Sequence, residues 1–354
     1  METLGLFYYS AQAIFTIVLM SIGGVILAKF KILDSSSLQT LSKVIFHLLL
    51  PCMLFASFTE KINFAKLMEL WVLPVTGVIF IVTGLALGTL AVRMIRISPE
   101  YKSVVTATCG FGNAMYLPFP LVIAICTIFP EFNKEPELQA MGIIYVSMFV
   151  IAFSPMMWTV GYNILGEKSH SSLKVSDFIT PPVWGIIAGL IAASIPSITL
   201  SSGNVFSLRA ALCDSSGFLH PVFTTCVSLG NAVVPCAMIV LGGSFALSPL
   251  AKHLDFRPAV IVIAVKLIIL PVLAIAYIKT LMHFNLIPHG KAQDTLLALV
   301  MLIQSAVPPA TSLIVISSLQ KKNVDEMGSL LLWLYLTSLL TLTIFIVIGM
   351  RIFQ

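Results

Sequence analysis

Charged residues are scarce in this sequence. Only 10% of its 354 residues are Asp, Glu, Lys or Arg, whereas 58% are hydrophobic and the mean hydropathy is +1.02. A soluble domain needs charged side chains on the surface that faces water, so this composition excludes an ordinary soluble protein. A bilayer removes that need. We therefore expect an integral membrane protein whose main surroundings are lipid.

Motifs for metal binding, disulfide frameworks and common catalytic sites are also missing. The six cysteines show no C-x-x-C or Cys/His ligand spacing, which argues against a zinc site and a disulfide scaffold. No H-E-x-x-H or G-x-S-x-G motif occurs, and every Asp and Glu lies in a loop or at the edge of an apolar run. We expect no enzymatic activity, no metal and no cofactor.

The formal net charge of +5 could suggest a nucleic-acid partner, but the basic residues are scattered between apolar runs instead of forming a patch. We therefore expect no nucleic-acid binding. Twelve Lys and Arg residues fall on one side of the expected membrane and seven on the other. The richer side is expected to be cytoplasmic, which places both termini outside or in a lumen.

Long apolar runs fill the chain, and a helix crosses the hydrocarbon core with about 20 apolar residues. Stretches without any charged residue occur at 3–28, 71–92, 103–130, 138–166, 178–208, 295–320 and 327–350. Less clean runs lie at 42–58, 220–247 and 258–277. The predicted fold class is an all-α polytopic membrane protein with about ten transmembrane helices.

Similar features recur five spans apart. Asn113 precedes Pro118 by five residues in the fourth predicted span, and Gln304 precedes Pro309 by five residues in the ninth. A Pro-Cys pair also recurs in the second and seventh spans. Because five is odd, the second half would be inserted upside down relative to the first, which is a common transporter plan.

We therefore predict two inverted five-helix repeats. The first repeat is expected at residues 1–166 and the second at 178–354. A short cytoplasmic link at 167–177 would join them, and no soluble domain is expected. A homodimer is possible.

Prolines predict breaks in the fourth and ninth spans, because proline lacks the amide donor and clashes with the preceding turn. These residues are Pro118 and Pro120 in the fourth span, and Pro308 and Pro309 in the ninth. Unpaired backbone inside a membrane is tolerated only where protein buries it or where it lines a cavity. A half-helix N-terminus there attracts anions. We expect the two broken helices to cross near the membrane midplane.

Side chains beside these breaks suit an organic anion. The amides of Asn113 and Gln304 can donate hydrogen bonds to a carboxylate. Met115, Tyr116 and Val307 can cover an apolar body. We predict that these five residues form a substrate site, with packing kinks as the plain alternative.

Lys266 is the one Lys or Arg deep inside an apolar run. Such a residue is by default a functional hypothesis. It could pair with an anionic substrate, brace carbonyls freed by Pro271, or reach the interface with its long side chain. His47 could relay protons, although a lone histidine in a short span is more often packed or interfacial.

At these residues the sequence resembles the auxin efflux carrier superfamily, and within it the PIN-LIKES proteins. The resemblance covers nearly the whole chain. The stretches that carry it are Leu70–Pro74, Gly112–Asn113 with Pro118, Asn231–Pro235, Gln304–Ala310 and Leu332–Tyr335. It implies two inverted five-helix repeats with crossing broken helices four and nine. It further implies transport of indole-3-acetic acid by alternating access, and residence in the endoplasmic reticulum membrane, with the plasma membrane as an alternative.

Some positions depart from the pattern of that superfamily. A second Asn before the span-four proline is replaced by Tyr116 and Leu117, and Leu50 stands where an Asn often precedes the span-two proline. Lys266 stands where relatives tend to carry Arg. These changes leave the substrate open. A bile-acid-type sodium symporter is the alternative carrier, although buried carboxylates for sodium are missing, and a membrane receptor is a further alternative.

Overall fold

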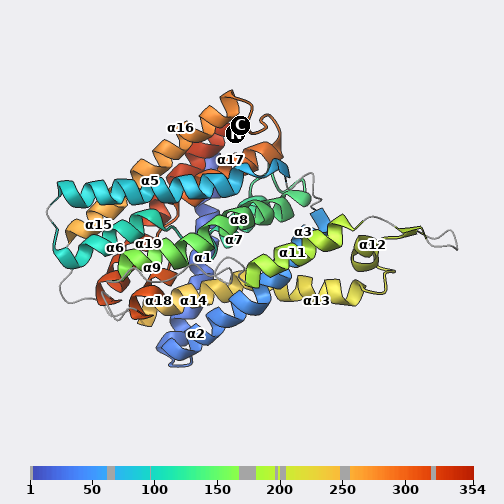
Figure 1. Cartoon of the computed structure of the whole chain (residues 1–354), viewed down its shortest axis with the longest axis horizontal. Helices are drawn as coiled ribbons and strands as arrows, with labels where there is room; N and C mark the ends of the chain where they lie inside the picture. Colours follow the sequence, from blue (N-terminus) through green and yellow to red (C-terminus); the bar gives the residue numbers. More distant parts are fainter. Residues whose placement is uncertain are drawn as a thin grey trace.

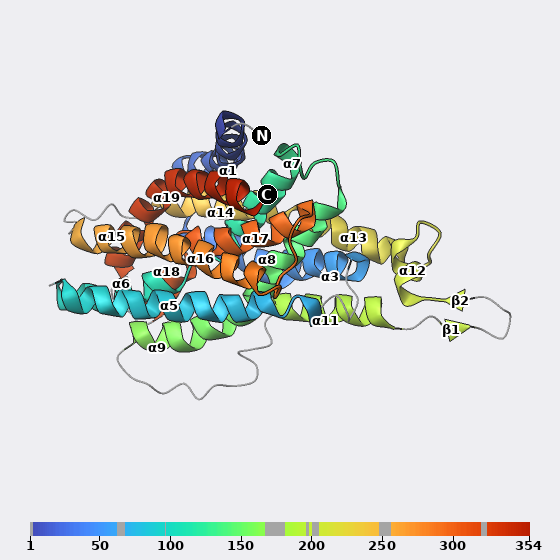
Figure 2. The ribbon, with the colours of Figure 1, turned by 90° about the horizontal axis from the view of Figure 1, so that it is seen from above.

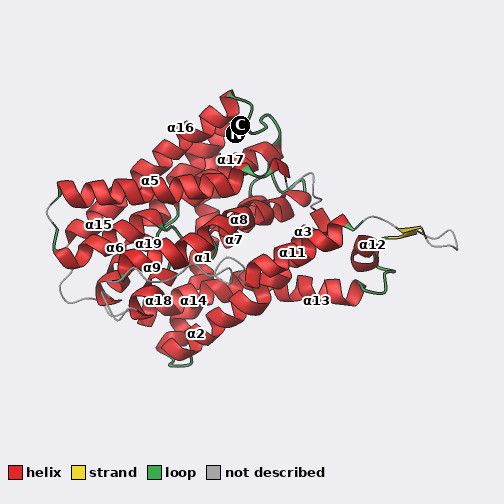
Figure 3. Cartoon of the chain, in the orientation of Figure 1, coloured by secondary structure: helices red, strands yellow, loops and turns green. Residues whose placement is uncertain are grey.

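Our computed structural model of the protein describes residues 3–61, 68–95, 97–166, 181–195, 198–199, 205–247, 256–319 and 324–354. Most of these residues form helices (Figure 3). The exception is an antiparallel ribbon of two short strands, β1 (Ile198–Thr199) and β2 (Val205–Phe206). The link predicted at 167–177 lies outside the described residues.

Six helical stretches of the described chain are long and apolar enough to cross a bilayer. Three are single helices: α1 (Thr3–Lys29), α5 (Val72–Met94) and α19 (Val324–Phe353). The other three consist of consecutive segments: α2 (Ser35–Val44), η1 (Ile45–Leu49) and α3 (Leu50–Lys61); α13 (His220–Asn231) and α14 (Val233–Leu247); α15 (Phe256–Val262), η3 (Ile263–Ile269) and α16 (Leu270–His283).

The remaining spans are bent, short or broken. One bends by 42° between α8 (Glu137–Met156) and the segments η2 (Met157–Gly161) and α9 (Tyr162–Leu165). Helix α11 (Pro181–Ser194) is short, and α12 (Leu208–Cys213) is shorter still. Two spans are broken: α6 (Pro99–Gly110) with α7 (Pro118–Ile128), and α17 (Ala292–Ala306) with α18 (Ser312–Leu319). In chain order these broken spans are the fourth and ninth of the ten expected. The helices and candidate spans together confirm the predicted fold class of an all-α polytopic membrane protein.

Two of the π-helical segments directly precede a helix that carries a proline near its start. Segment η1 precedes Pro51, and η3 precedes Pro271. Proline removes one helical donor and crowds the preceding turn. A local π turn is one way in which a membrane helix accommodates such a residue, and π turns are frequent at functional sites. Both ionisable residues singled out in the sequence lie in these π segments, His47 in η1 and Lys266 in η3.

The helices form two groups. Helix α1 lies along α14, and α3 lies along α11 and α13, so the first, second, sixth and seventh spans pack together (Figure 1). Helix α5 packs on α6 and α8, and α17 on α16 and α19. Glycine permits the closest approach in the first group, because a β-carbon on Gly242 would overlap the Ser21 carbonyl. The start of α1 and the end of α19 lie close together (Figure 2).

Candidate functional site

The breaks in the fourth and ninth spans meet each other. The backbone N–H of Asn113 donates to the Pro308 carbonyl at 2.7 Å, and that of Ala310 donates to the Phe111 carbonyl at 2.9 Å. Gly112 and Pro309 thereby form an isolated antiparallel bridge. Backbone groups that the helices leave unpaired thus satisfy one another inside the protein, as the membrane interior requires.

Asn113 also starts the second half of its span. Its side-chain oxygen accepts a hydrogen bond from the Tyr116 N–H at 2.9 Å, and the Met115 N–H lies at 3.4 Å. This is the geometry by which Asn satisfies free donors ahead of a helix. Helix α7 then begins at Pro118, which has no N–H to satisfy, and Pro120 follows within its first turn. Asn113 is therefore structural as well as a candidate ligand.

The two predicted amides both lie at the crossing and are nearly inaccessible. Asn113 is 2% exposed and donates from Nδ2 to the Tyr335 hydroxyl at 2.6 Å. Gln304 is 6% exposed and donates from Nε2 to the Ala114 carbonyl at 3.2 Å. An amide nitrogen carries two hydrogens. In this conformation one donor of each amide therefore braces the crossing, and one is left for another partner.

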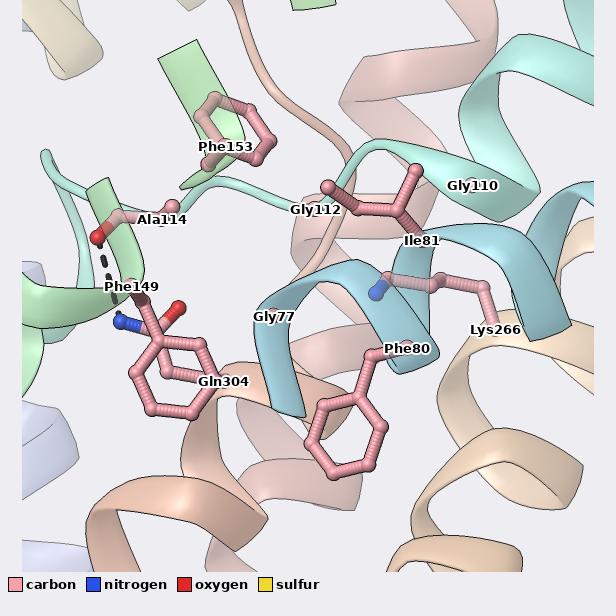
Figure 4. A pocket seen from close by; sticks show the side chains of 10 residues that line it. All are labelled: Gly77, Phe80, Ile81, Gly110, Gly112, Ala114, Phe149, Phe153, Lys266 and Gln304. Carbon is pink, nitrogen blue, oxygen red and sulfur yellow. Dashed lines mark hydrogen bonds between the residues drawn. The ribbon is translucent and has the colours of Figure 1, made fainter. Parts of the chain in front are cut away.

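Lys266 reaches the same place from the eighth span. Its side chain is 2% exposed, and a β-carbon built on Gly112 would lie 2.8 Å from its Nζ. In Figure 4 the amine end points toward Gly112 and Gly77, with Gln304 on the opposite side. Lys266 and Gln304 line one small cavity together with Gly112 and three aromatic side chains, Phe80, Phe149 and Phe153. The sequence could not show that Lys266 adjoins the span-four break.

The three predicted apolar residues lie near the crossing and differ in how deeply they are buried. Val307 is fully buried, and its Cγ2 would lie 3.2 Å from a β-carbon on Gly112. Met115 is buried, and Tyr116 is partly exposed in the turn before α7. None of the three lines the cavity beside Lys266. The aromatic wall of that cavity and Tyr335 were missed by the sequence reasoning, since no motif marks them as site residues.

His47 lies elsewhere. Its side chain is exposed, and Nδ1 lies 3.0 Å from the Lys43 carbonyl of its own span. It does not line the cavity beside Lys266. Within the described residues no group of three His, Cys, Asp or Glu side chains could hold a metal ion.

Nearly the whole chain is similar in sequence to known proteins. A family model described as membrane transport protein matches residues 9–346. Protein PIN-LIKES 7 of Arabidopsis thaliana is 25% identical over 99% of this chain and 100% of its own length. Protein PIN-LIKES 5 of the same plant is 24% identical over 95% of each chain. An uncharacterized transporter of Saccharomyces cerevisiae is 22% identical over 97% of this chain and 95% of its own.

Proposed function

Since the chain belongs to the membrane transport protein family, the superfamily of the auxin efflux carriers, we propose that it carries a small organic anion across the bilayer. The proposed anion is indole-3-acetic acid or a similar aromatic carboxylate, as the resemblance to the PIN-LIKES proteins implies. The protein is an integral membrane transporter. Its substrate and mechanism are the parts proposed here.

The crossing of the two broken spans is the observation that carries the proposal. It brings Asn113 and Gln304, which are 191 positions apart in the chain, to one buried point where the helix ends of both breaks also meet. The N-terminus of α7 adds a partial positive charge on the same side as Asn113. A carboxylate could accept the second N–H of each amide, while Met115, Tyr116 and Val307 would contact the apolar body.

Space for that substrate must open as the protein moves, because the crossing is almost fully buried in this conformation. We propose alternating access between the two helix groups. The group of spans one, two, six and seven is closely packed and would act as the fixed frame. The group that carries the crossing would slide or rock against it. The two inverted repeats would give the outward and inward forms related geometries.

Binding to the purified transporter tests the site. Equilibrium binding of radiolabelled indole-3-acetate would be measured for the wild type, Asn113→Ala and Gln304→Ala. Loss of a desolvated partner costs about 1–3 kcal/mol, so each variant should bind more weakly by that amount. Gln293→Ala is the matched control, since this amide sits on the same helix but bonds the Tyr145 hydroxyl at 3.0 Å.

Competition with unlabelled carboxylates then separates the site from the substrate. If other acids bind the wild type but not these variants, and indole acids never bind, the proposed site is supported and indole-3-acetic acid is rejected as the substrate. Equal binding by the wild type and both variants would make the crossing purely structural. Repeating the assay with sodium replaced by potassium distinguishes a sodium-coupled symporter, which would lose affinity.

A further inference from the structure

The ammonium of Lys266 lacks a counter-charge in the described part of the protein. Within the described residues its Nζ has no hydrogen bond or ion pair, and its electrostatic neighbour is the buried Cys109 side chain, which carries no charge as a thiol; the Lys266 side chain is 2% exposed. No Asp or Glu lines the cavity into which it points. A buried charge without a partner is strongly unfavourable. Something beyond the described side chains must therefore neutralise it, or the amine must lose its proton.

The cavity limits what that partner can be. Its volume is ≈ 20 Å³, whereas a cavity needs roughly 10–15 Å³ to hold one water molecule. An aromatic carboxylate cannot enter a space of that size. The partner is therefore a single small species, either a monatomic ion or a water molecule.

The lining of the cavity favours an anion over a cation. Lys266 brings a positive charge from one side, and the Gln304 side chain, which donates from Nε2 to the Ala114 carbonyl, lies on the other (Figure 4). Phe80, Phe149 and Phe153 supply apolar rings to the wall of the cavity and no negative charge. A metal cation would find no carboxylate here and would be repelled by the ammonium.

We propose that this cavity is a binding site for a monatomic anion, with chloride as the physiological ligand. The anion would pair with Lys266 Nζ beside Gly112, which is itself bridged to Pro309. Its presence would therefore stabilise the crossing from the side of the eighth span. This site shares Gln304 with the carboxylate site of the proposed function, but its test uses halides alone and does not depend on which acid is carried.

Thermal unfolding of the detergent-purified protein tests the proposal. The melting temperature would be compared in sodium chloride, sodium bromide and sodium gluconate at equal ionic strength. A ligand that binds only the folded state raises the melting temperature by mass action, so both halides should raise it by several degrees relative to gluconate. Lys266→Met, which keeps the length of the side chain without its charge, should lose this difference. Lys279→Met changes an exposed lysine of the next helical segment and should retain it.

Every outcome decides the proposal. Equal melting temperatures of the wild type in all three salts would overturn it in favour of a water molecule or a neutral amine. A halide effect that survives in Lys266→Met would place the anion elsewhere and also overturn it. If Lys266→Met does not fold, radiolabelled chloride is added to the wild type. Saturable binding that bromide displaces and gluconate does not supports the site, and no saturable binding refutes it.

Discussion

The side-chain amide of Asn113 donates a hydrogen bond of 2.6 Å to the hydroxyl of Tyr335. This bond joins the break in the fourth span to α19. The Tyr335 ring in turn meets the ring of Phe245 edge-on, with centroids 4.9 Å apart. Phe245 belongs to α14, which lies along α1 in the other helix group. Tyr335 therefore links a candidate substrate ligand to the proposed frame.

Replacing Tyr335 with Phe should weaken substrate binding. The change removes the hydroxyl that holds the Asn113 amide in place. It also leaves a buried N–H of Asn113 without its partner, which costs about 1–3 kcal/mol of folding free energy. The ring contact with Phe245 would remain. Dissociation constants for indole-3-acetate and melting temperatures would be measured together. Tyr145→Phe is the control, because it removes an equivalent bond to Gln293 away from the crossing. An unchanged dissociation constant in Tyr335→Phe would show that the hydroxyl has no role in substrate binding.

Gly112 should tolerate no larger side chain. A β-carbon there would lie 2.8 Å from Lys266 Nζ and 3.2 Å from Val307 Cγ2. The end of a lysine can move, whereas Val307 is fully buried. Overpacking of this kind costs about 1–3 kcal/mol, so Gly112→Ala should lower the free energy of unfolding by that amount.

Two further variants check this explanation. Adding Val307→Ala to Gly112→Ala should restore part of the loss, since contacting sites are not additive. Gly23→Ala should cause no loss, because no atom lies within 4 Å of a β-carbon built there. Thermal or denaturant unfolding in detergent measures these two variants together with Gly112→Ala and Val307→Ala alone. A double variant with the simple sum of both losses would contradict the steric account.

Relative movement of the two helix groups can be tested with cysteine pairs in a background without native cysteines. Tyr9 of α1 and Phe129 at the end of α7 have ring centroids 5.7 Å apart, across the two groups. Ser21 Oγ of α1 and Met238 Sδ of α14 are 3.7 Å apart, within one group. Bridging Tyr9→Cys and Phe129→Cys should abolish transport reversibly. Bridging Ser21→Cys and Met238→Cys should leave it unchanged.

Vesicle uptake before bridging, after bridging and after reduction gives the comparison. The unbridged double variants serve as their own baselines. Transport that continues when Tyr9→Cys and Phe129→Cys are fully bridged would show that the groups need not move apart at that point. Loss of transport on bridging the Ser21 and Met238 positions would contradict a rigid frame.

Sequence reasoning succeeded where the signal is local. Apolar runs located the spans, and prolines located the breaks between Gly110 and Pro118 and between Ala306 and Ser312. It failed where contacts join distant segments. Asn113 and Tyr335 are 222 positions apart, and nothing local specifies their bond. The position of Lys266 against Gly112 also depends on the packing of the eighth span on the break, which composition cannot show.

Membrane orientation is the last prediction. Lys and Arg are more numerous on the side that contains the turn between α1 and α2, and positive loops stay in the cytoplasm. The structure adds two suitable exposed positions, Ser36 at the start of α2 and Lys134 in the connection from α7 to α8. An odd number of spans, three, separates them. In a background without native cysteines, Ser36→Cys should react with an impermeant maleimide only from the cytoplasm, and Lys134→Cys only from the other side. The opposite pattern would invert the topology, and labelling of both from one side would contradict the assignment of the second, third and fourth spans.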